Sequence, residues 1–171
     1  GVYYNISSGR NLADWAEPSG KPRRMMALPD LAREIEEADP PVAFAWVDGF
    51  NAVNQVPDAA RMAAAFENIP FTVVVDAFMT DTAMRANLIL PCALGFEKED
   101  LLGSCMHNAV NYMAIVAEPP GLARSDFDII SDLAQRLDSS VSIPPAEECL
   151  RRVLEDKRLN SSLEHVRAQG Y

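Results

Sequence analysis

Polar residues and a glycine follow two apolar runs of the chain, residues 42–47 and 71–75, at positions where they could contact a ligand. Gly49 would let backbone N–H groups approach a phosphate or diphosphate, and Asn51 would add a side-chain donor and acceptor. Asp76 could accept two hydrogen bonds from the N–H and NH₂ edge of a guanine, because an ionised carboxylate only accepts. Thr80 could bond a ribose or a phosphate. These residue types are therefore compatible with a nucleotide-like ligand.

Each of these residues also has an ordinary structural interpretation. Gly49 and Asn51 suit a plain strand-to-helix turn, and Asp76 suits the end of a strand or the cap of a helix. A threonine such as Thr80 is a common N-cap residue. Taken from the residues alone, the structural interpretations are favoured, and the ligand stays open.

The remaining reactive side chains form no recognisable catalytic or metal-binding pattern. The three cysteines lack the spacing of zinc or iron–sulfur ligands, and neither histidine has a second ligand placed beside it. Glu97, Glu99 and Asp100 could form a catalytic carboxylate pair, but a solvated acidic loop is the favoured interpretation. The motifs of serine hydrolases, P-loop proteins and dinucleotide dehydrogenases are absent.

Charge and hydropathy exclude two further classes of partner. Fifteen basic against twenty-five acidic residues give a net charge of −10, which disfavours nucleic acid, because phosphate contacts need clustered Lys and Arg. No apolar run approaches the length of about 20 residues that a membrane span needs, so no direct membrane insertion is expected. The compartment, cytoplasm or periplasm, is left open.

Short apolar runs alternate with helix-like segments around the candidate residues. Residues 42–47, 71–75 and 88–90 are typical of strands buried in a parallel sheet. Helices are expected at about residues 29–38, 57–68, 129–137 and 144–156, and in a last segment ended by Gly170. Residues 92–109 are expected to form a long polar loop and residues 110–116 an edge-type strand. This alternation predicts the α/β class, with ligands beyond the carboxyl ends of the strands.

Several spaced motifs occur in a fixed order along residues 41–137. They are GxN followed by VPD, then DxFxTxTA, a strand ending in LP, ExED, and EPxGxARSD before a helix. With these motifs the chain resembles the molybdopterin oxidoreductases of the dimethyl sulfoxide reductase and formate dehydrogenase superfamily. The resemblance implies a Rossmann-like three-layer α/β sandwich with a mostly parallel sheet.

The resemblance also implies a cofactor and a role for each candidate residue. The fold would hold one of two molybdopterin guanine dinucleotides, with molybdenum or tungsten in the parent enzyme. Gly49 and Asn51 would lie on the diphosphate side, Asp76 and Thr80 near the guanosine, and Asn108 near the cofactor. No catalytic residue and no metal ligand is assigned within the chain, and an iron–sulfur cluster is expected only outside it.

We expect a single cofactor-binding domain over residues 1–171, excised from a larger enzyme, with an irregular lead-in at 1–27, a core at 28–138 and C-terminal helices at 139–171. Alone it is expected to be inactive, because the family's catalytic subunits are far longer. Its expected partners are iron–sulfur electron-transfer subunits and the remaining domains of the parent catalytic subunit. The alternative is a stand-alone α/β binding or structural module that has lost the cofactor.

Overall fold

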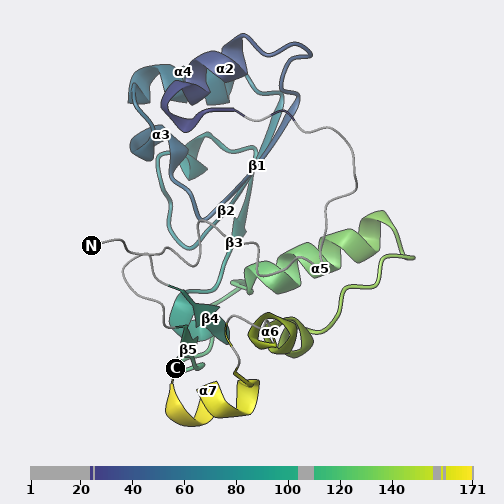
Figure 1. Cartoon of the computed structure of the whole chain (residues 1–171). Coiled ribbons are helices and arrows are strands. Elements are labelled where there is room, and N and C mark those ends of the chain that lie inside the picture. Colours follow the sequence, from purple (N-terminus) through teal and green to yellow (C-terminus); the bar gives the residue numbers. More distant parts are fainter. Residues whose placement is uncertain (1–23, 25, 104–109, 156–158, 160, 171) are drawn as a thin grey trace. The chain divides into compact units, whose positions relative to one another are not determined.

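The computed structural model describes residues 24, 26–103, 110–155, 159 and 161–170 (Figure 1). The chain divides into two compact units. The sheet unit consists of Pro22–Ala93 and Pro120–Asp126, and the helical unit consists of Leu94–Pro119 and Phe127–Tyr171 together with Gly1–Lys21. The single domain expected from the sequence stays a prediction.

A parallel sheet of three strands forms the centre of the sheet unit. The strands, in the order β1-β2-β3, are β1 (Phe44–Asp48), β2 (Phe71–Asp76) and β3 (Leu88–Pro91). Their apolar, largely β-branched sequences suit a sheet with buried surfaces, and Val74 and Val75 at the centre of β2 are almost fully buried. The predicted α/β class and the parallel sheet are confirmed.

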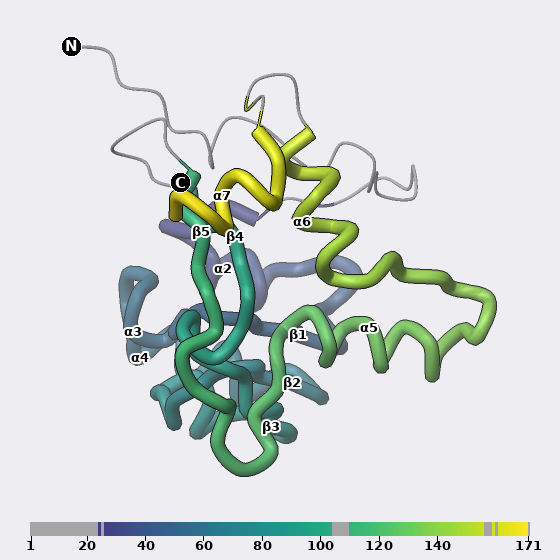
Figure 2. The backbone as a smooth tube through the Cα atoms, turned by 90° about the horizontal axis from the view of Figure 1, so that it is seen from below, coloured from purple at the N-terminus to yellow at the C-terminus, as the bar shows by residue number. Residues whose placement is uncertain are grey.

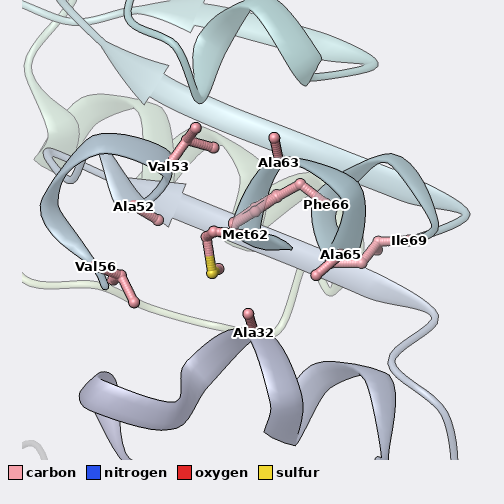
Figure 3. Packing of buried hydrophobic residues seen from close by; sticks show 9 residues of the cluster. All are labelled: Ala32, Ala52, Val53, Val56, Met62, Ala63, Ala65, Phe66 and Ile69. Carbon is pink, nitrogen blue, oxygen red and sulfur yellow. The ribbon is translucent and has the colours of Figure 1, made fainter. Parts of the chain in front are cut away.

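Short helices precede and connect these strands and form the main core of the sheet unit. They are η2 (Leu28–Asp30), α2 (Leu31–Glu36), α3 (Ala52–Gln55), α4 (Ala59–Glu67) and η3 (Ala83–Arg85). Met62 on α4 is completely buried among residues of α2, α3 and α4 (Figure 3), and Ala45 and Val47 of β1 pack against this cluster. The predicted helices at 29–38 and 57–68 are confirmed, whereas α3 was not predicted.

The helical unit contains a two-stranded antiparallel sheet and three longer helices. Its elements are η4 (Gly95–Glu97), β4 (Asp100–Leu102), β5 (Asn111–Met113), α5 (Asp126–Leu137), α6 (Ala146–Leu154) and α7 (Leu163–Gln169). β4 and β5 run side by side (Figure 2). The prediction of one long loop was wrong for residues 92–103, which contain η4 and β4, and its residues 104–109 lie outside the described part of the chain. The edge-type strand predicted at residues 110–116 is present as β5, which pairs with β4 in a separate two-stranded sheet.

Side chains from β5, α7 and the segment before β4 hold the helical unit together. Leu154, Leu163 and Val166 form its buried apolar cluster. Beside it, the Tyr112 hydroxyl donates to Glu99 Oε1 at 2.6 Å, and Arg167 Nε donates to the same oxygen at 2.7 Å. Among the described residues, no helix is long and apolar enough to cross a membrane.

Candidate functional site

The candidate site lies at the carboxyl edge of the parallel sheet, where Gly49 forms the turn after β1. Gly49 has a φ of +57°, a left-handed conformation that favours glycine, and an added Cβ would meet no atom within 4 Å. Its N–H donates to Val75 O at 3.1 Å, so this donor already serves the sheet. The structure therefore gives Gly49 a conformational role and open space beside its Cα.

The turn after β2 holds the Asp76 carboxylate in a fixed orientation. Asp76 Oδ1 accepts from the N–H of Phe78 at 3.0 Å, and Oδ2 accepts from the Thr80 hydroxyl at 3.4 Å. Thr80 Oγ1 in turn accepts from the N–H of Ala83 at 3.2 Å. A carboxylate has about four acceptor positions. With these contacts counted, each oxygen of Asp76 keeps one position for a further donor.

Asn51 joins the turn after β1 to the turn after β2. Its Oδ1 accepts from the Thr82 hydroxyl at 2.8 Å and from the Thr82 N–H at 3.2 Å. Thr82 Oγ1 also accepts from the N–H of Val53 at 3.0 Å, and Thr82 is fully buried. The side-chain oxygen of Asn51 is thus bonded within the protein, and of its side chain only the N–H₂ group remains for partners other than Thr82.

A second, more exposed contact between the same two turns involves Asp81. Its Oδ2 accepts from Asn54 Nδ2 at 3.2 Å and from Asn51 Nδ2 at 3.5 Å. These donors, Asn54 foremost, lower the pKa of Asp81 below its ordinary value, because they stabilise the ionised form. Arg85 Nη1 donates to the Asp81 carbonyl at 2.7 Å.

The structure brings four of the five predicted site residues to one edge of one sheet. In the parallel register, Asp48 lies opposite Val75, so the next residues, Gly49 and Asp76, begin neighbouring turns. Asn51 lies on the first of these turns and Thr80 on the second. Asn108 lies outside the described residues. The sequence reasoning missed Thr82, although the DxFxTxTA motif contains it and its neighbour Ala83 is buried.

The chemistry of this edge favours hydrogen-bond donors on the ligand. Asp76 and Asp81 are acceptors, Asn51 adds donors, and Arg85 contacts this edge through the Asp81 carbonyl. A carboxylate that is already aligned by two donors suits the paired N–H groups of a guanine better than it suits a phosphate. No group of three or more His, Cys, Asp or Glu that could hold a metal ion occurs among the described residues.

The fold defines an α/β domain, and the candidate site lies at the carboxyl edge of its parallel sheet, where open sheets of this class bind nucleotide-like ligands. Comparison with known proteins identifies the family. A sequence model of the family described as molybdopterin oxidoreductase matches residues 10–136. The chain belongs to this family, as its motifs predicted.

Similar proteins with curated descriptions are much longer than this chain. The chain is 44% identical over 116 residues to the probable oxidoreductase YyaE of Bacillus subtilis, which covers 67% of the chain and 17% of that protein. It is 31% identical over 152 residues to a putative catalytic subunit of dimethyl sulfoxide reductase from Halobacterium salinarum, which covers 86% of the chain and 18% of that protein. The chain therefore spans less than a fifth of the length of these relatives.

A solved structure shows the same fold. Acetylene hydratase from Pelobacter acetylenicus superposes with a TM-score of 0.66 over 81% of this chain and 20% of that chain, at 23% sequence identity. At this identity the likeness concerns the fold alone.

Proposed function

We propose that this chain is a binding domain for molybdopterin guanine dinucleotide in a molybdenum- or tungsten-dependent oxidoreductase. Membership of the family implies a molybdopterin-type cofactor. We propose, more specifically, that this cofactor is the guanine dinucleotide form. When bound, such a cofactor supplies the metal centre at which two-electron redox chemistry takes place. The part of this chain is to hold the nucleotide end of that cofactor.

The observation that carries the proposal is the hydrogen bonding of the Asp76 carboxylate. Phe78 N–H, at 3.0 Å, and the Thr80 hydroxyl, at a longer 3.4 Å, occupy one acceptor position on each oxygen and orient the group. The second position on each oxygen matches the two adjacent N–H donors of a guanine. Adenine and the pyrimidines do not present such a pair of adjacent donors on one edge, so the arrangement favours guanosine.

On the diphosphate side of the proposed site, the role that we assign to Gly49 differs from the one predicted from the sequence. The N–H of Gly49 is bonded to Val75 O, so we assign Gly49 the role of leaving room for close approach instead of donating. Asn51 can donate through Nδ2, because its Oδ1 is bonded to Thr82. One Nδ2 hydrogen of Asn51 faces Asp81, and the open space beside Gly49 with the other Nδ2 hydrogen fits a polar contact that needs no positive charge.

We propose, further, that the chain has no turnover alone and acts as part of a larger catalytic subunit. The lengths of its relatives support this, since the chain covers 17% and 18% of two of them. The remaining domains of that subunit, together with iron–sulfur electron-transfer subunits, are the proposed partners. The alternative, a stand-alone module that has lost the cofactor, predicts no bound pterin.

The test is to analyse what the purified protein contains. The full-length protein that carries this sequence is isolated from cells supplied with molybdate, denatured in acid and separated by chromatography. The proposal predicts an oxidised pterin, identified by its fluorescence, and GMP in equal amounts. Pterin without GMP, or with another nucleotide, would refute the guanine assignment, and absence of both would favour the stand-alone module.

A further inference from the structure

We infer that Thr82 is a positioning residue that holds the two turns of the proposed nucleotide site at a fixed separation. The inference rests on the proposed function, because it concerns the same site. The relevant turns are the one after β1, which carries Gly49 and Asn51, and the one after β2, which carries Asp76 and Thr80. Thr82 belongs to the second turn and bonds to the first.

Three hydrogen bonds join Thr82 to the turn after β1. Its hydroxyl donates to Asn51 Oδ1 at 2.8 Å and accepts from the N–H of Val53 at 3.0 Å. Its backbone N–H donates to the same Asn51 oxygen at 3.2 Å. One residue therefore uses both its side chain and its backbone to connect segments that are about thirty positions apart in the sequence.

Burial makes this connection stronger than the parallel contact at the surface. Thr82 is fully buried, so water cannot replace its partners, and removal of its hydroxyl leaves the N–H of Val53 without its acceptor. The contact between Asn54 and Asp81 links the same turns at 3.2 Å, but it is exposed and competes with water. The separation of the turns thus depends mainly on Thr82.

The positions of the proposed ligand groups follow from this connection. Asn51, which Thr82 orients, comes two residues after Gly49. Thr80, which orients the Asp76 carboxylate, comes two residues before Thr82, and its hydroxyl also accepts from the N–H of Ala83 directly after Thr82. Because Thr82 is buried, it acts through Asn51 and through the turn that carries Thr80, and it makes no contact with a ligand itself.

The test uses one substitution and two controls in the full-length protein. Thr82→Val keeps the size and branching of the side chain and removes the hydroxyl, while Thr82→Ser keeps the hydroxyl. Thr72→Val is a matched control, because Thr72 is also fully buried and its Oγ1 has no hydrogen-bond partner among the described residues. Two quantities are measured well below the melting temperature of each variant: GMP released per protein, and amide hydrogen exchange of the peptide over residues 51–56.

Thr82→Val is expected to release about half as much GMP as the wild type, because the resemblance implies a second dinucleotide held outside this chain. Its residue 51–56 amides are expected to exchange about tenfold faster than those of the wild type, as the loss of a buried partner predicts. Thr82→Ser and Thr72→Val are expected to keep wild-type values. Wild-type values in Thr82→Val, or equal losses in Thr72→Val, would overturn the inference. If the wild type releases no GMP, the proposed function fails, while the exchange comparison still decides whether Thr82 holds the turns.

Should Thr82→Val fail to fold, Asn51→Ala removes two of the three hydrogen bonds from the other side and leaves the one from the N–H of Val53. Faster exchange over residues 80–83 in that variant supports the connection, and unchanged exchange there overturns it.

Discussion

The carboxylate of Asp76 and the turn at Gly49 differ in what they leave available to a ligand. Asp76 is held by Phe78 and Thr80 and keeps one acceptor position on each oxygen. Gly49 has its N–H engaged with Val75, and what it offers is its left-handed conformation and the absence of a side chain. The guanosine half of the proposed site therefore rests on a specific donor–acceptor match, and the diphosphate half rests on space.

Replacement of Gly49 by alanine tests the role of that space. Gly49→Ala places a Cβ on a residue with a φ of +57°, which is expected to cost about 1 kcal/mol of folding stability, since L side chains disfavour this region. The new Cβ would also enter the open space that we propose for the ligand, so GMP content should fall. Urea unfolding and nucleotide release are the two measurements.

Gly170→Ala provides the control for this substitution. Gly170 ends α7 in the helical unit with a φ of +83°, and an added Cβ there also meets no atom within 4 Å. It should show a similar loss of stability with unchanged GMP content. Equal GMP content in Gly49→Ala and Gly170→Ala would refute the role of Gly49 at the ligand.

At the scale of helices and strands, sequence periodicity predicted the elements that contain a run of buried residues or an apolar face. The strands at 71–76 and 88–91, and α4 with its alanines, follow directly from residue types. α3 has four residues and β4 and β5 have three each, which is too short for a period to be visible, and their existence depends on contacts with distant segments. Sequence reasoning therefore located Gly49, Asn51, Asp76 and Thr80 but could not show that Asn51 is bonded to Thr82.

The packing of α4 predicts a large effect at one methionine and little at another. Met62 on α4 is 0% exposed in the core of the sheet unit, so Met62→Ala is expected to lower the free energy of unfolding by about 2–5 kcal/mol. Met79 is 65% exposed, and Met79→Ala should change the free energy of unfolding by less than about 0.5 kcal/mol. Chemical denaturation compares the two, and similar losses would show that the core is placed wrongly.

A titration tests how β5 is attached to the segment before β4. The Glu99 carboxylate, which accepts from the Tyr112 hydroxyl, raises the pKa of Tyr112 above its ordinary value of 10.0. The protonated phenol is the form that the folded state favours. Its contribution to stability is therefore complete below pH 10.0 and is lost as the pH rises through the higher folded value.

Tyrosinate absorbance is expected to show a late-titrating component in the wild type, which is lost in Tyr112→Phe. Glu99→Gln keeps a hydrogen-bond acceptor but removes the charge, and should return that titration toward the ordinary range. An unchanged late titration in Tyr112→Phe would mean that another tyrosine is responsible.

For the whole molecule, the role proposed for this chain depends on its family and on the share of its relatives' length that it spans. It belongs to the molybdopterin oxidoreductases, and it spans less than a fifth of two relatives. Its net charge of −10 does not conflict with an anionic cofactor, because the contacts proposed for that cofactor come from neutral amides, open space and a carboxylate facing a base. We therefore propose that the chain is the nucleotide-holding part of a longer enzyme.

The most direct test of the guanosine site is the GMP content of the full-length protein with Asp76→Asn. Asparagine keeps the shape but turns one acceptor into a donor that opposes the N–H groups of guanine, so occupancy of this site is expected to fall about tenfold. The GMP content of the full-length protein should then fall to about half, because the resemblance implies a second dinucleotide held outside this chain. Asp138→Asn is the matched control, because Asp138 Oδ1 also accepts from a backbone N–H two residues on, at 2.9 Å, and from a hydroxyl, at 2.6 Å. Wild-type GMP content in Asp138→Asn with a loss of about half in Asp76→Asn would support the guanosine site, and wild-type content in both would contradict it.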